Sequence, residues 1–104
     1  MSEPRIFHQF DVFRQPDRSY VLNLRNDVLD GLPVLPVALL EPAEGRYTAI
    51  RGLQPVLTVG EVRLRLAPHF LVTLALPEVG PTIANLAHER DEIIRALDLL
   101  LTGV

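Results

Sequence analysis

Short stretches in which apolar and polar residues alternate fill the first eighty positions, a pattern typical of β-strands. Ile6–Phe13 is predicted to be one strand and Tyr20–Leu24 its partner. The segment between them, Arg14–Ser19, is polar and contains a proline, which predicts an exposed loop. The residues expected to share the inward faces of these two strands are Ile6, Phe10, Val12, Tyr20, Leu22 and Leu24.

A hairpin is predicted over Val56–Leu66. Gly60-Glu61 is the glycine-X pair of a two-residue type II′ turn, in which glycine supplies the positive φ. The resulting register pairs Val59 with Val62 and Leu57 with Leu64, all on one face, and leaves Thr58, Arg63 and Arg65 on the other.

Two further strands contain or follow a proline. Asp30-Gly31 marks a turn before the apolar stretch Val34–Leu40, where Pro36 predicts an edge strand or a bulged one. Pro68 is expected to interrupt the chain, so that Phe70–Leu74 forms a separate short strand.

From Thr82 the spacing of apolar residues changes to three and four, which predicts an amphipathic helix up to Gly103. Its start could lie just after Pro81 or nearer His88. Several antiparallel strands followed by one C-terminal helix predict a mostly β or α+β fold, a small barrel being one form of it.

Length and composition restrict the kind of protein. A chain of 104 residues is expected to be a single domain, residues 1–104. The net charge of −3 and the scattered arginines, with no lysine, argue against direct nucleic-acid binding. Cysteine is absent, so cysteine-based metal sites and thiol chemistry are excluded. With no signal peptide or membrane span in the sequence, a cytoplasmic location is expected.

Candidate catalytic residues are few. His88, Asp91 and Glu92 have the spacing of side chains that meet on one helix face, and such a group could serve acid–base or metal chemistry. An ordinary solvated helix turn is the favoured interpretation. No phosphate-binding loop, HExxH motif or nucleophile elbow is present, so no cofactor and no metal are expected.

Two apolar groups admit both a structural and a functional interpretation. Val28 and Leu29 lie inside a polar turn, where core residues beneath the loop are favoured over contact residues. The leucines at positions 99–101 span about 200° of a helix, so they cannot all face one core. A terminal turn packed on the barrel, or a homodimer seam, is favoured over an apolar tip that inserts into a partner.

Four segments, taken together and in order, resemble the CcdB family of toxins. The most extensive is Ile83–Ile93 followed by Ala96–Leu99 and the terminal Gly103-Val104. The others are Gln9–Val12, Asn26–Asp30 and Leu53–Val56, which leads into the hairpin. Each is weak alone, whereas their order and spacing are specific.

The resemblance implies an SH3-like antiparallel barrel with a C-terminal α-helix that forms a two-fold homodimer. It also implies a CcdA-like antitoxin and, as target, the DNA gyrase A subunit, on which the toxin docks without chemistry of its own. The gyrase contacts that it implies are Val28, Leu29, Asp98, Leu101, Thr102, Gly103 and Val104. The implied antitoxin contacts are Arg14, Gln15, Pro16, Asp17, Arg18 and Ser19.

The chain departs from the family pattern at its C-terminal end. Thr102 stands where the best-known member has a tryptophan that stacks on a gyrase arginine, Leu101 replaces a phenylalanine, and Asp98 replaces an asparagine. An aromatic–arginine contact of that kind is worth ~2 kcal/mol, roughly thirtyfold in affinity. An alternative is therefore a diverged homologue that dimerises and binds its antitoxin but poisons gyrase weakly or not at all.

Overall fold

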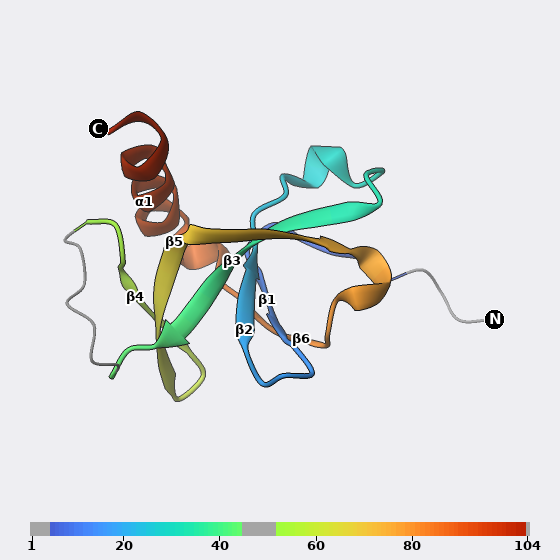
Figure 1. The fold of residues 1–104 in the computed structure, drawn as a ribbon, viewed down its shortest axis with the longest axis horizontal. Helices are drawn as coiled ribbons and strands as arrows, with labels where there is room; N and C mark the ends of the chain where they lie inside the picture. Colours follow the sequence, from blue (N-terminus) through green and yellow to red (C-terminus); the bar gives the residue numbers. More distant parts are fainter. Residues whose placement is uncertain (1–4, 45–51, 104) are drawn as a thin grey trace.

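The computed structural model describes residues 5–44 and 52–103 (Figure 1). Within these ranges the chain forms six strands, three 3-10 segments and one α-helix. The strands are β1 (Asp11–Arg14), β2 (Tyr20–Asn23), β3 (Val34–Pro42), β4 (Val56–Val59), β5 (Val62–Ala75) and β6 (Thr82–Asn85). The helical segments are η1 (Asp27–Leu29), η2 (Leu76–Glu78), η3 (Ala87–Glu89) and α1 (Arg90–Thr102).

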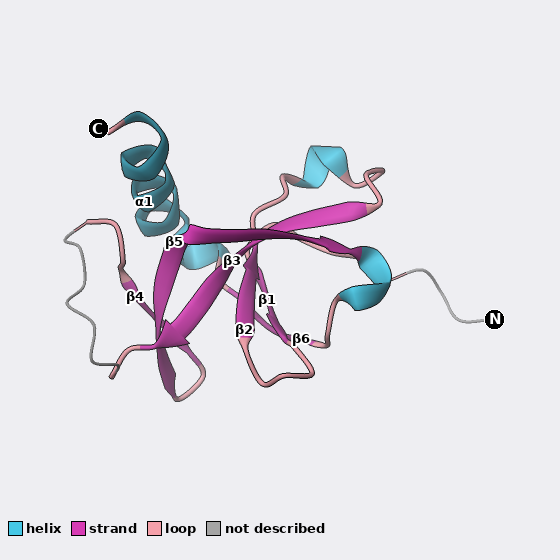
Figure 2. Ribbon diagram, in the orientation of Figure 1, coloured by secondary structure: helices cyan, strands magenta, loops and turns pink. Residues whose placement is uncertain are grey.

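The described strands form one antiparallel sheet in the order β4-β5-β3-β2-β1-β6. The sheet curls into a nearly closed barrel, with α1 at one end (Figures 1 and 2). This architecture confirms the predicted fold class, a mostly β barrel with a C-terminal helix.

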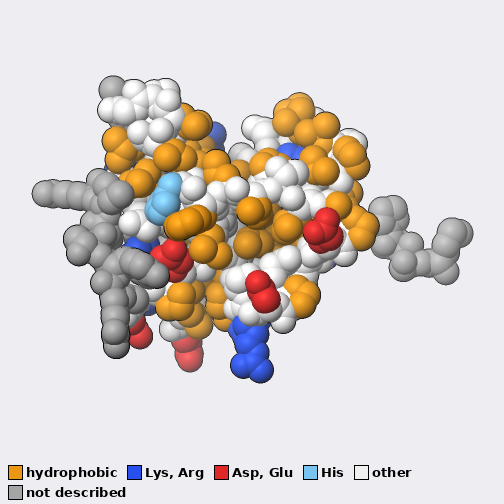
Figure 3. Space-filling view, in the orientation of Figure 1, with side chains coloured by type: hydrophobic (Ala, Val, Ile, Leu, Met, Phe, Trp, Pro, Cys, Tyr) orange, Lys and Arg blue, Asp and Glu red, His pale blue; other side chains and the backbone are white. Residues whose placement is uncertain are grey.

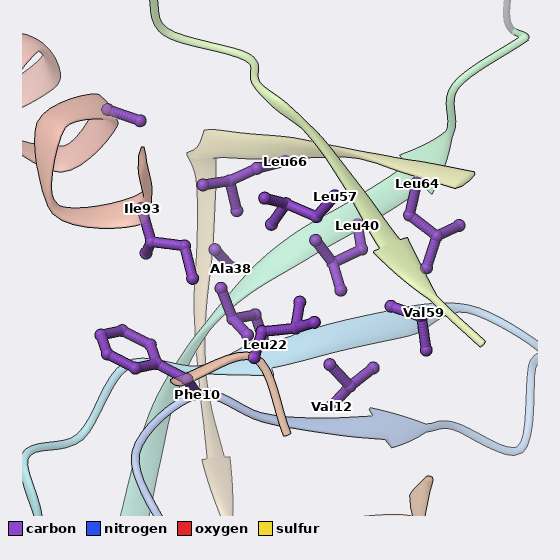
Figure 4. Packing of buried hydrophobic residues seen from close by; sticks show 12 residues of the cluster. Phe10, Val12, Leu22, Ala38, Leu40, Leu57, Val59, Leu64, Leu66 and Ile93 are labelled. Carbon is purple, nitrogen blue, oxygen red and sulfur yellow. The ribbon is translucent and has the colours of Figure 1, made fainter. Parts of the chain in front are cut away.

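The barrel interior holds a core to which five strands and the helix contribute. Val12, Leu22, Leu40 and Leu64 point toward one another from four different strands (Figure 4). The helix adds Ile93 and Ala96, both fully buried, and this explains why α1 is amphipathic. Removing so much apolar surface from water is the main force that closes the barrel over the helix.

A second apolar cluster lies on the opposite face of β1, β2 and β3. It contains the following residues: Phe7, Phe13, Val21, Leu35, Val37 and Val79. Phe7 packs edge-on against Phe13, with ring centroids 5.7 Å apart. Because both faces of the central strands are covered, their sequences are almost continuously apolar.

The structure confirms the β4–β5 hairpin in its predicted register, Val59 with Val62 and Leu57 with Leu64. Gly60 has φ +61° and Glu61 has no positive φ, as a type II′ turn requires. Arg65 lies on the face opposite Leu64, as predicted, and that face is covered there: the residue is 9% exposed and donates from Nη2 to the Ala43 carbonyl at 2.9 Å.

The separate strand predicted after Pro68 was wrong, because β5 runs without a break through it. Its pairing with β3 shifts between Ala38, opposite Leu71, and Leu39, opposite Ala67. The three residues left over, 68–70, form a bulge at which β5 bends (Figure 1). Pro68 occupies this bulge, where no ladder hydrogen bond is required of it.

Pro36 lies in β3, which is an interior strand between β2 and β5, so the predicted edge position was wrong. The bulged alternative was wrong too, because the extra residues of the register shift lie on β5 and Pro36 pairs with Thr73. The Pro36 carbonyl accepts a hydrogen bond from the Leu24 N–H at 3.0 Å. Its missing N–H is tolerated because the pairing of β2 with β3 ends at Asn23 and Val37.

The first strand is shorter than predicted and begins at Asp11. Ile6 is 73% exposed, whereas Phe10 and Val12 are buried as expected. Phe10 has φ +71°, which turns the chain just before the strand. Asp11 is buried and accepts hydrogen bonds from the His8 N–H and the Asn85 amide, both at 2.8 Å.

The later of the two predicted helix starts is confirmed, since Thr82–Asn85 pairs with β1 as a strand and α1 begins at Arg90. On the exposed face of the helix, Arg95 and Glu92 form an ion pair at 3.4 Å. Among the described residues, no helix has the length and apolar character needed to cross a membrane.

Candidate functional site

His88, Asp91 and Glu92 do not form a cluster, so the alternative to a solvated turn was wrong. His88 lies in η3, ahead of the helix, and its Nε2 is 4.0 Å from a carboxylate oxygen of Glu89 rather than paired with Asp91 or Glu92. Over residues 5–44 and 52–103, no group of three histidine or acidic side chains is placed to hold a metal ion. The candidate sites among these residues are therefore surfaces on which a protein partner could dock.

The loop between β1 and β2 is a tight hairpin turn. The Arg18 N–H donates to the Gln15 carbonyl and the Gln15 N–H to the Ser19 carbonyl, both at 2.8 Å. Pro16 takes the second position of this turn, for which its fixed φ is suited. Arg18 has φ +72°, and a left-handed residue after a type I turn is the usual geometry of a three-residue hairpin loop.

Side chains hold this loop in shape. The Asp17 carboxylate accepts hydrogen bonds from the Ser19 hydroxyl at 2.5 Å and the Ser19 N–H at 2.9 Å, and these bonds lower the pKa of Asp17. The Arg14 guanidinium lies 5.0 Å from the centre of the Tyr20 ring and donates to its hydroxyl. Of the loop's charged side chains, that of Arg18 is the one that makes no hydrogen bond with the described chain and is exposed.

Gln15 anchors the loop to the segment after η2. Its amide nitrogen donates to the Glu78 carbonyl at 3.0 Å, and its amide oxygen accepts from the Gly80 N–H at 2.7 Å. A Cβ on Gly80 would lie 2.0 Å from the Arg14 carbonyl oxygen, so only glycine fits at this position. The loop is therefore presented in one orientation.

A groove of about 480 Å³ lies beside this loop. The loop supplies Gln15, Pro16, Asp17 and Ser19 as one wall. The remaining lining residues are apolar and come from β2, β3 and β5: Val21, Leu39, Phe70, Val72 and Leu74. Four of the six residues predicted as antitoxin contacts thus border one apolar groove.

Val28 and Leu29 project from η1 into solvent, with 81% and 47% of their surfaces exposed. The favoured interpretation of them as core residues was therefore wrong. Asn26 caps η1, accepting a hydrogen bond from the Val28 N–H at 3.0 Å. The cap satisfies a backbone N–H at the start of η1 and so stabilises the turn that carries the two exposed side chains.

The end of α1 presents the other predicted contacts. Leu101 is 73% exposed, and Asp98 is exposed as well. The Thr102 hydroxyl donates to the Asp98 carbonyl at 2.7 Å, so this side chain lies against its own helix. Gly103 ends the helix with φ +78°, while Val104 lies outside the described residues.

The two predicted gyrase-contact groups do not meet within one chain. The end of α1 and η1 project from the same side of the molecule, with β5 running between them (Figure 1). Apolar side chains gather over η1 and over the middle of this face (Figure 3). A target that touches both groups must therefore be broad, or must bind two copies of the chain.

Sequence reasoning missed the apolar floor of the groove. Phe70 and Val72 were assigned to a strand, but nothing in their spacing indicated that both would be about 54% exposed. The bulge at Pro68 was the available signal, since bulges redirect side chains and often border binding sites.

Comparisons with known proteins bear on these surfaces. The sequence profile of the family described as CcdB protein matches residues 9–103. The chain belongs to the CcdB family. The resemblance seen in its four segments is thereby confirmed, and at this level the chain is a toxin of a toxin–antitoxin system.

No protein of curated function matches the chain. Solved structures do match, among them one described as an endoribonuclease from mycobacterial species, with a TM-score of 0.78. That match covers 96% of this chain and 95% of the other at 14% sequence identity. The TM-score shows that the two proteins share a fold, and at 14% identity the activity of this chain stays open.

Proposed function

We propose that this CcdB-family protein inhibits DNA gyrase by non-covalent docking on its A subunit. The supporting observation is exposure: among the described large apolar side chains, the three most exposed are Val28, Ile6 and Leu101. Two of these three are positions that the family pattern assigns to gyrase contact. An exposed apolar side chain contributes little to the folded core, whereas it stabilises a complex when a partner protein covers it.

The apolar groove beside the β1–β2 loop is the proposed site for the antitoxin. The groove has a volume of about 480 Å³, an apolar floor and a polar wall. Such a groove suits a peptide segment of a partner protein that buries one apolar face. Asp17 and Arg18 stand at the exposed rim, where charges govern which partner is accepted. In this proposal Gln15 positions the loop, because both ends of its amide are engaged.

In this proposal the protein is not an enzyme and works in the cytoplasm as a homodimer. Docking requires no nucleophile, acid or base, and the separation of His88 from Asp91 and Glu92 agrees with that. Because an endoribonuclease has a similar fold, RNA cleavage is the competing activity that the experiment must also measure.

The experiment measures DNA breaks made by purified gyrase, and cleavage of a structured RNA, with the toxin added to each. Breaks are expected to accumulate with the wild-type protein and to be suppressed by a CcdA-like antitoxin, while the RNA stays intact. Val28→Asp is expected to abolish the breaks. Ile83→Asp, which changes an exposed apolar residue of β6 outside the predicted contacts, is the matched control and should retain them.

Two other outcomes would indicate a different function. RNA cleavage without DNA breaks would replace gyrase docking by a ribonuclease activity. Binding of the antitoxin without either activity would favour the diverged homologue that binds its antitoxin but does not poison gyrase, for which the absence of an aromatic ring at Thr102 supplies a reason.

A further inference from the structure

A second, smaller pocket of about 250 Å³ lies at the end of the molecule where η1 and η2 approach the N-terminal segment (Figure 1). Its lining residues are Arg5, Ile6, Phe7, Arg25, Asp30 and Leu76. Two of them are cationic and one is anionic, so the lining carries a net positive charge. The pocket is separate from the groove beside the β1–β2 loop, because the two share no lining residue.

Arg25 is the unusual member. Its side chain is buried, with only 4% of the residue exposed. Nη1 donates to the Leu32 carbonyl at 2.8 Å, whereas Nε is buried and has no hydrogen-bond partner in the described chain. A guanidinium keeps its charge in proteins, so Arg25 is a buried cation with an unused donor.

The neighbouring charges leave this cation uncompensated. No carboxylate of the described residues forms an ion pair with Arg25, and Asp30 lines the pocket without reaching it. Arg5 donates to the carbonyls of Val79 and Gly80 and to the Thr82 hydroxyl, all of them neutral acceptors. Its guanidinium also lies 4.8 Å from the centre of the Phe7 ring.

Buried charges are normally paired, because an unpaired one gives up its hydration without return. An oxyanion in the pocket can supply the negative charge that is missing beside the two guanidinium groups, and hydrogen bonds between arginine and an anion are among the strong ones. The volume suffices for a carboxylate or phosphate group together with several waters, each of which occupies about 30 Å³ in the liquid.

We propose that this pocket binds an oxyanion, a carboxylate or a phosphate, through the Arg25 guanidinium with Arg5 at its rim. The oxyanion can come from a free ion or from an acidic side chain of a docked protein. Asp30 weakens the site by repulsion and so limits it to ligands of low charge.

The test measures anion binding by calorimetry and by melting temperature, in phosphate, in acetate and with a glutamate-rich peptide, against chloride at equal ionic strength. The wild-type protein should show saturable binding and a matching rise in Tm. Arg25→Met should weaken binding at least about tenfold, since a charged hydrogen bond is lost. Asp30→Asn should strengthen it, whereas Arg95→Met, on the exposed face of α1, should leave it unchanged.

The arms separate the possible sources. Binding of phosphate or acetate identifies a free ion as sufficient, and binding of the peptide alone identifies an acidic side chain; both support the proposal. No saturable binding to the wild-type protein overturns it, including the case in which binding appears only in Asp30→Asn, because Asp30 then closes the pocket itself. Equal binding to Arg25→Met also overturns it. If that variant does not fold, Arg25→Lys retains the charge without Nε and should still bind phosphate more weakly.

Discussion

Individual residues fix the shape of the β1–β2 loop. Arg18 holds a left-handed conformation without being glycine, Asp17 accepts two hydrogen bonds from Ser19, and Gln15 ties the loop to the backbone at Glu78 and Gly80. A loop with so many local bonds loses less conformational entropy when a partner binds. The residues that would recognise the antitoxin are thus the same ones that make the loop rigid.

Ser19→Ala should raise the pKa of Asp17 toward its usual range, because the Ser19 hydroxyl bond is the largest cause of the lowering. A carboxyl whose pKa is lowered by folding favours the folded state above its unfolded pKa, and loses that contribution as the pH falls through the folded pKa. The variant should therefore show less loss of stability in acid from this group. An NMR titration of the Asp17 carboxyl measures the shift, Ser19→Thr serves as the control that keeps the hydroxyl, and an unchanged pKa in Ser19→Ala would refute the assignment.

Gly80→Ala should destabilise the fold, because the added Cβ would lie 2.0 Å from the Arg14 carbonyl oxygen, a backbone atom that cannot move alone. Overpacking of this kind costs about 2 kcal/mol, or a fall in Tm of roughly 8 °C for a domain of this size. Gly31→Ala is the matched control, since nothing lies within 4 Å of its Cβ, and its Tm should hardly change. Equal melting temperatures for the two variants would contradict the close approach.

Exposure at single positions was the hardest property to predict. Alternation places a residue on one face of a strand but does not say whether that face is covered, and Arg65, on the face opposite Leu64, is buried. Val28 and Leu29 were expected inside and are exposed, because the cap at Asn26 closes η1 as a separate turn. The burial of Arg25 had no signal in the sequence.

Elements were predictable wherever the local chemistry of the chain decides them. The Gly60-Glu61 turn sets the register of the β4–β5 hairpin, and the three-four spacing sets the helix. Long-range pairing decides the others: Thr82–Asn85 carries apolar residues that would suit a helix, yet it completes the barrel beside β1. The bend in β5 likewise depends on β3 as its partner and not on Pro68 alone.

Two substitutions test whether the end of α1 is a gyrase-contact surface. Gly103→Arg should abolish gyrase poisoning and keep the fold, since no atom lies within 4 Å of a Cβ there and the φ of +78° costs a non-glycine residue about 1 kcal/mol. Thr102→Trp should change stability by no more than about 0.5 kcal/mol, because the side chain is exposed. It should raise potency roughly tenfold or more by restoring the aromatic ring.

Growth inhibition and melting temperature, measured on both variants, decide between contact surface and core. Full toxicity of Gly103→Arg, or unfolding of Thr102→Trp, would show that this end of the chain has a structural role. The gyrase-contact surface would then have to be sought around η1.

In the molecule as a whole, the pairing of β1 with β6 joins segments some seventy residues apart, as in Asp11 with Asn85. No local pattern determines such a pair, and it was not predicted from the sequence. The helix position follows from the same closure, because Ile93 and Ala96 complete the interior core. Local patterns do not determine which exposed apolar residues would contact a second copy of the chain in the expected homodimer.

We expect a homodimer in which the end of α1 takes part, because a chain with this much exposed apolar surface gains by covering it. Sedimentation at low micromolar concentration should give twice the monomer mass for the wild-type protein. Leu100→Asp should weaken the dimer at least about tenfold, since this half-buried leucine of the helix end is not among the predicted gyrase contacts and a charge there would be buried in the seam without a partner. Val62→Asp, at an exposed site beside the β4–β5 turn, should remain dimeric. A wild-type monomer would defeat the proposal, and a dimer insensitive to Leu100→Asp would move the seam away from the helix to another exposed apolar surface, such as that at Leu71 on β5.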